Sequence, residues 1–62
     1  MLEYFKKILS KVSFDKKLFE KELLKAIRSL VPDEIKQLKE WCYSHFVQYE
    51  PILEKCFAQK PL

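Results

Sequence analysis

The sequence predicts an all-α fold, a small bundle of three helices plus a short C-terminal helical segment. The 62 residues include no glycine and no asparagine, on which tight β-hairpin turns depend. Pro32, Pro51 and Pro61 stand singly, at positions where helices would begin or end. A chain of this length forms one domain with a thin core, so residues 1–62 are expected to be a single helical domain.

The first helix is expected at about residues 2–12. Its apolar residues recur at the spacing of one helical face, and Lys7 and Lys11 point away from that face. We expect this face to pack on the other helices, although the same pattern of apolar and basic residues also occurs in helices that lie on membranes. The apolar residues are Leu2, Phe5, Ile8, Leu9 and Val12.

The second helix is expected from Lys16 to about Leu30, with Asp15 as its N-cap. The carboxylate of Asp15 can accept hydrogen bonds from N–H groups of the first turn. Phe14 is spaced to pack on Phe19 as a hydrophobic staple. An apolar stripe covers about one third of the helix circumference. It consists of Phe19, Leu23, Ala26, Ile27 and Leu30.

The third helix is expected from Pro32 to about Gln48. Proline loses no backbone hydrogen bond at the first helical position, and Asp33 and Glu34 complement the positive end of the helix dipole. Val31 stands where Ser or Thr would normally cap the helix, so this start is expected to depend partly on burial of Val31. The apolar residues of this helix are Ile35, Leu38, Cys42, Phe46 and Tyr49.

A break in the helix is expected near Tyr49 to Glu50. Pro51 cannot donate a backbone hydrogen bond and crowds the preceding turn, so it should open a short last segment. The tail AQKPL is expected to fray. The apolar residues of the last segment are Ile52, Leu53, Cys56 and Phe57.

The composition indicates a cytoplasmic protein without a transmembrane segment. Two cysteines are too few for a disulfide framework. A secretory signal needs an uninterrupted apolar stretch, and charged residues interrupt the apolar residues at the start of this sequence. No apolar run exceeds three residues, whereas a membrane-spanning helix needs about 20. No cofactor is expected.

Cys42 and His45 lie three residues apart in the segment KEWCYSHF, close enough on one helix to reach a shared metal ion. A structural zinc site normally has four ligands in two spaced pairs, and only Cys56 could join these two residues. A catalytic thiol would need an orienting group and a cleft, which a thin bundle offers poorly. We therefore expect no metal ligand and no catalytic residue here, and a core role for Cys42.

The first half of the chain is basic, because residues 1–30 hold eight Lys or Arg against four acids, and residues 31–62 hold four against five. Four cations of the second helix, spaced three or four residues apart, lie within about 80° of its surface. We call them the basic ridge: Lys17, Lys21, Lys25 and Arg28. A solvated face flanked by Glu20 and Glu22 is the more common explanation. The alternative is weak, nonspecific binding of nucleic acid or another polyanion.

Five apolar residues lie off the expected core faces or at their margin, namely Leu18, Leu24, Trp41, Tyr43 and Val47. Since 48% of so short a chain is hydrophobic, we expect these residues to form a patch covered by a second subunit, with Trp41 and Tyr43 as anchors. The open alternative is that other parts of the same chain cover them. The sequence therefore predicts a non-catalytic interaction module that acts by helix packing, as a homodimer or with another protein.

Overall fold

The computed structural model describes residues 1–58 and confirms the all-α fold class. This part of the chain contains four α-helices, one 3₁₀ turn and no strand. The elements are α1 (Leu2–Val12), α2 (Lys16–Ser29), α3 (Pro32–His45), η1 (Val47–Tyr49) and α4 (Glu50–Ala58). Ala58 is thus still helical, and the rest of the tail that was expected to fray lies outside the described residues.

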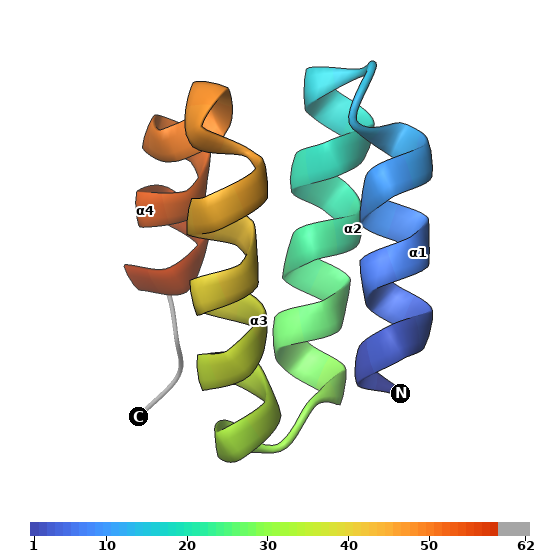
Figure 1. The fold of residues 1–62 in the computed structure, drawn as a ribbon, viewed down its shortest axis with the longest axis vertical. Coiled ribbons are helices and arrows are strands. Elements are labelled where there is room, and N and C mark those ends of the chain that lie inside the picture. Colours follow the sequence, from blue (N-terminus) through green and yellow to red (C-terminus); the bar gives the residue numbers. More distant parts are fainter. Residues whose placement is uncertain (59–62) are drawn as a thin grey trace.

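The four helices are arranged as a ring around one core. Helix α1 packs on α2 and α3, and α4 packs on the same two helices from the other side. Successive helices run in opposite directions, so the α1–α2 joint and the η1 turn lie at one end of the bundle (Figure 1). The α2–α3 joint and the N-terminus lie at the other end. The short C-terminal segment predicted from the sequence is therefore a full member of the bundle.

The core is apolar and receives side chains from all four helices. No charged or polar residue of the described chain is buried. The predicted apolar stripes therefore supply the core, as their spacing indicated. The buried residues are Phe5, Leu9, Phe19, Leu23, Ala26, Ile27, Leu30, Leu38, Cys42, Phe46, Ile52, Leu53 and Cys56.

The start of α2 has the predicted cap but not the predicted staple. Asp15 Oδ1 accepts hydrogen bonds from the backbone nitrogens of Lys17 at 3.0 Å and Leu18 at 3.1 Å. Phe14 does not pack on Phe19, because its side chain is 79% exposed. The ring of Phe19 packs instead on two aromatic rings from later in the chain, those of Phe46 and Tyr49, with centroid distances of 4.9 and 4.8 Å.

The start of α3 also differs from the sequence prediction in one respect. Pro32 is the first helical residue, as expected. Val31 is exposed, so the expectation that its burial would stabilise this start is wrong. The side chain of Glu34 supplies the missing cap, because its Oε1 accepts a hydrogen bond from the Val31 backbone nitrogen at 3.4 Å.

Helix α3 ends at His45, three residues before the predicted end at Gln48. Phe46 leaves the helical conformation, with φ −127° and ψ 52°, and the η1 turn follows. Pro51 has no N–H to donate to the Val47 carbonyl, which excludes one regular helix through this region. Packing then determines where the chain breaks, since the turn at Phe46 places both Phe46 and Tyr49 against Phe19.

Candidate functional site

The two thiols lie in the core. Cys42 of α3 is fully buried and Cys56 of α4 is 1% exposed, and both are free. Burial raises the pKa of the Cys42 thiol from its ordinary 9.0 to about 12, with a smaller contribution from Cys56. Burial also raises the pKa of Cys56, to which the nearby Glu20 carboxylate adds. Because the thiolate is the reactive form, both groups are poor nucleophiles in the folded protein.

His45 does not face the Cys42 sulfur. Its side chain is exposed, and its Nδ1 lies 3.0 Å from the backbone oxygen of Trp41, to which it donates in the corresponding tautomer. Cys42 and His45 are therefore neighbours on α3 that point into different surroundings, one into the core and one to the surface. In residues 1–58, no group of three His, Cys, Asp or Glu side chains is placed to hold a metal ion.

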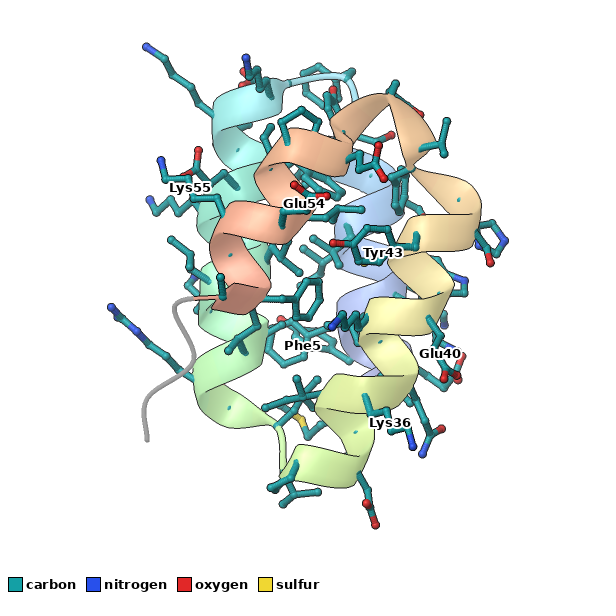
Figure 2. All side chains as sticks on the ribbon, turned by 90° about the vertical axis from the view of Figure 1, so that its left-hand side faces the viewer. Phe5, Lys36, Glu40, Tyr43, Glu54 and Lys55 are labelled. Atoms are coloured by element: carbon teal, nitrogen blue, oxygen red, sulfur yellow. The ribbon has the colours of Figure 1, made fainter. Side chains whose placement is uncertain are left out.

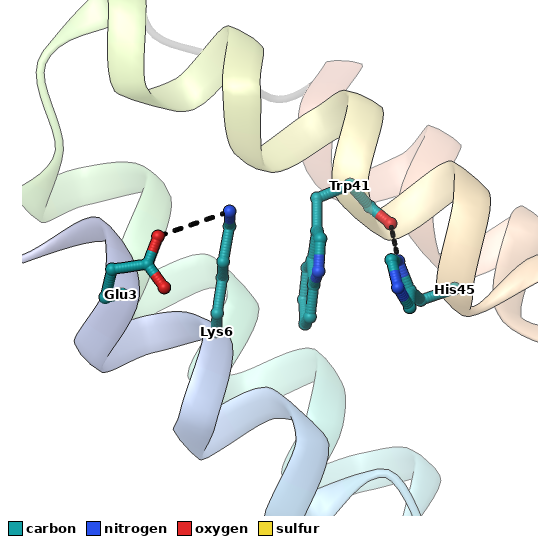
Figure 3. A network of polar contacts seen from close by, with 4 residues as sticks. All are labelled: Glu3, Lys6, Trp41 and His45. Atoms are coloured by element: carbon teal, nitrogen blue, oxygen red, sulfur yellow. Dashed lines mark hydrogen bonds and ion pairs between the residues drawn. The ribbon is translucent and has the colours of Figure 1, made fainter.

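Trp41 packs within its own chain and connects α3 to α1. Its ring lies between the Lys6 side chain on one side and the His45 ring on the other (Figure 3). The Lys6 Nζ is 5.7 Å from the indole centroid, and the His45 centroid is 5.0 Å away with an interplanar angle of 30°. Lys6 is itself paired with Glu3 at 3.4 Å, and Phe46 meets the indole edge-on at 5.3 Å.

Tyr43 lies on the opposite flank of α3, against α4 (Figure 2). It is half-buried, and this partial burial raises the pKa of its hydroxyl, with further increases from the Glu54 and Glu50 carboxylates. Leu24 of α2 is also half-buried and packs against the core. Much of the surface of these residues and of Trp41 is therefore covered by the chain itself.

The five predicted interface residues do not form one patch. Leu18 and Leu24 are about 120° apart around α2, and the basic ridge runs between them. Trp41 and Tyr43 face different neighbouring helices, α1 and α4. Leu18 and Val47 are the members with exposed side chains, at 39% and 68%.

Phe14 is the most exposed of the large apolar residues, and the sequence did not suggest it as a possible contact. It lies in the α1–α2 joint, at the end of the bundle that also carries Val47 of η1. The two joints are linked, because the Tyr49 hydroxyl donates a hydrogen bond to the Ser13 carbonyl oxygen. A signal was present in the sequence: Phe19 already belongs to the core stripe of its helix, so a staple with Phe14 was not needed to bury it.

The basic ridge is fully displayed on the outer side of α2. All four of its side chains are exposed. Lys25 pairs with Glu22 at 3.6 Å, and the other three make no ion pair with any described residue. Glu20 lies on the other flank of α2 and pairs with Lys55 of α4 at 3.1 Å, so it does not neutralise the ridge. All four ridge side chains are therefore solvated, as expected, and among them the described structure pairs an acid of α2 with Lys25 alone.

The charges divide the molecule into two halves. Helices α1 and α2 and their joints carry the basic excess of residues 1–30. Residues 31–58, which form α3, η1 and α4, carry three lysines and five acids. In the ring, α1 lies next to α2 and α3 lies next to α4. The surface therefore has a basic side, formed by α1 and α2, and an acidic side, formed by α3 and α4.

Comparison with models of protein families, with curated proteins and with solved structures found no match. Within the described part of the chain, no helix has the length and apolar character needed to cross a bilayer. Two surface features have chemistry that suits binding: the exposed apolar residues Phe14 and Val47 at one end of the bundle, and the basic ridge on its side.

Proposed function

We propose that the protein is a non-catalytic helical interaction module that self-associates as a homodimer. The supporting observation is the exposure of two large apolar side chains, Phe14 and Val47, at the same end of the bundle. Such side chains are ordinary when they occur singly, but two at one end of a small domain give a contact surface its apolar centre.

A second copy is the partner that this end suits best. In a two-fold symmetric contact each chain presents the same surface, so the Phe14 and Val47 of both subunits become covered together. Ser13, Asp15 and Gln48 lie beside these residues in the sequence and would provide the polar rim that such contacts have. Leu18, in the first turn of α2, lies beside this end and is left outside the dimer contact.

In this proposal the other three predicted interface residues have a supporting role. Trp41 joins α3 to α1, Tyr43 packs toward α4, and Leu24 packs on the core. They maintain the ring of helices that presents the end with Phe14 and Val47. We also propose that the protein works in the cytoplasm, since both cysteines are free and a reducing compartment keeps thiols in that state.

Sedimentation equilibrium over a range of concentrations tests the dimer. We expect twice the mass of one chain, and the mass of one chain for the double variant Phe14→Ser/Val47→Ser. Circular dichroism should show the same helix content in both, because the two side chains lie outside the core. A matched control is Val31→Ser, which changes an exposed valine at the other end of the bundle and should leave the dimer intact. A wild-type chain that stays single at the highest concentration would refute the proposal.

A second candidate function is polyanion binding through the basic ridge. It is supported by the three ridge cations that make no ion pair with a described residue. Binding of this kind releases counterions and weakens steeply as salt rises. Fluorescence anisotropy with a labelled DNA duplex at low salt should show binding that disappears at higher salt, and heparin should compete. No binding to either polyanion at low salt would remove this candidate.

A further inference from the structure

The outer surface shared by α1 and α2 carries more than the ridge. On α1, Lys7 and Lys11 are exposed, and each lies about 160° around the helix from the fully buried Leu9. On α2, Lys21 lies about 160° from the fully buried Leu23 in the same way. The cations of both helices therefore point away from the core, on two helices that pack side by side.

Two exposed apolar residues lie among these cations. Lys6 contacts Trp41, so it marks the side of α1 that faces α3. Tyr4 lies about 160° around α1 from Lys6, and it is therefore on the side of α1 that faces α2. Glu20 pairs with Lys55, so it marks the side of α2 that faces α4. Leu18 lies about 160° around α2 from Glu20, and it is therefore on the side of α2 that faces α1. Tyr4 is 57% exposed, and Leu18 is also exposed.

We propose that this surface, the α1–α2 face, docks on a lipid bilayer that contains anionic lipids. The face comprises Tyr4, Lys7, Lys11, Leu18 and the basic ridge. This inference rests on the second candidate function and names the polyanion. The lysines and the arginine meet the negatively charged headgroups, and Tyr4 and Leu18 enter the boundary between headgroups and acyl chains.

A bilayer suits this surface better than a nucleic acid. The phosphates of a nucleic acid would use the cations, and the exposed Tyr4 ring suits stacking on a base. The aliphatic side chain of Leu18 has no counterpart there, because bases stack on aromatic rings. A bilayer interface accepts the charged and the apolar side chains of the face together.

The protein docks as a folded unit. The apolar side of α1 already packs on the other helices, because Phe5 and Leu9 are buried in the core. The opposite, basic side of α1 is the one that meets the membrane, so α1 does not have to leave the bundle. Binding should therefore leave the helix content unchanged. Trp41 lies on the α1–α3 side, and its fluorescence should also change little.

Vesicle co-sedimentation at low salt tests the inference. We expect the wild-type protein to bind vesicles of equal parts phosphatidylcholine and phosphatidylserine, and not vesicles of phosphatidylcholine alone. The variant Lys21→Glu/Arg28→Glu should lose about tenfold or more in partitioning, since each basic residue near an anionic surface contributes substantially. Its matched control is Lys36→Glu/Lys39→Glu, which makes the same change of charge at exposed positions of α3. The control should retain most of the binding.

The apolar contribution is tested with Tyr4→Ser at constant salt. This variant should bind the anionic vesicles more weakly than wild type. Val31→Ser is the matched control, because Val31 is also 57% exposed but lies in the α2–α3 joint. An equal effect of the two substitutions would contradict the placement of Tyr4 at the membrane.

The outcomes separate the inference from the function on which it depends. Binding to the DNA duplex without binding to anionic vesicles would overturn the membrane inference and retain the polyanion function. Absence of binding to the duplex, heparin and the vesicles at low salt would overturn both. Equal loss of vesicle binding in the two charge variants would show an effect of net charge alone and would overturn the assignment to the α1–α2 face.

Discussion

The hydroxyl of Tyr49 donates a hydrogen bond to the backbone carbonyl oxygen of Ser13, a residue 36 positions earlier in the chain. This bond connects the turn before α4 to the joint between α1 and α2. The Tyr49 ring also packs on Phe19, in the second turn of α2. One side chain thus holds together three segments at the end of the bundle where Phe14 and Val47 are exposed.

Removing that hydroxyl should weaken the fold by a modest amount. Tyr49→Phe keeps the ring against Phe19 and loses only the hydrogen bond, so the free energy of unfolding should fall by about 0.5–1.5 kcal/mol. Urea denaturation measures the change. Tyr4→Phe is the control, because Tyr4 is exposed and its hydroxyl makes no hydrogen bond with a described residue. Equal losses for both variants would contradict a role for the bond to Ser13.

The N-cap of α2, Asp15, should stabilise the fold because its side-chain oxygen accepts hydrogen bonds from the backbone. Asp15→Ala leaves the backbone N–H groups of Lys17 and Leu18 without their partner, so the free energy of unfolding should fall by about 1 kcal/mol. Asp15→Asn keeps an acceptor oxygen and should remain close to wild type. Thermal or urea denaturation of the two variants makes the comparison, and an equally large loss for Asn would indicate that charge, rather than the cap, is responsible.

Both thiols should react slowly in the folded protein. The side chains of Cys42 and Cys56 are buried, and burial raises the pKa of each thiol, so little reactive thiolate is present or accessible. A chromogenic disulfide reagent at neutral pH should modify the native protein far more slowly than the urea-unfolded protein. The single variants Cys42→Ala and Cys56→Ala identify which thiol reacts. Rapid labelling of native Cys42 would revive the reactive-thiol hypothesis.

Stability should decline in alkaline solution. The unfolded chain releases the Cys42 proton near the ordinary pKa of 9.0, whereas the folded chain keeps it up to about 12. Between these values the unfolded state binds fewer protons, so the free energy of unfolding falls as pH rises, by about 1.4 kcal/mol per pH unit for each such thiol. The raised pKa values of Cys56 and Tyr43 act in the same direction.

Urea denaturation at pH 8, 9 and 10 measures this decline. The Cys42→Ala variant should begin less stable at pH 8, because it leaves space in the core. Its stability should then fall less steeply above pH 9 than that of wild type. Parallel declines in the two proteins would show that Cys42 does not ionise differently in the folded and unfolded states.

The sequence predicted the first half of the fold closely because its signals there are local. The apolar spacing of residues 2–12 and the cap at Asp15 correspond to the observed limits of α1 and to the start of α2. The burial of Cys42 also followed from its place in an apolar stripe. These features depend on residues within one or two turns of each other.

The end of α3 and the surface depend on contacts between distant segments. The break at Phe46 rather than near Tyr49 depends on how both rings pack on Phe19, which is far away in the sequence. Nothing in the sequence indicates that Trp41 lies between His45 and Lys6, because Lys6 belongs to another helix. Such contacts require the spatial arrangement of the helices.

The position of α4 in the chain has a consequence for biosynthesis. Ile52, Leu53 and Cys56 complete the core, and they belong to the last helix of the bundle. The core therefore cannot close until these residues have left the ribosome. Until then the nascent chain holds Phe19 and Leu23 without their final partners, so a chaperone that shields the growing chain should assist its folding.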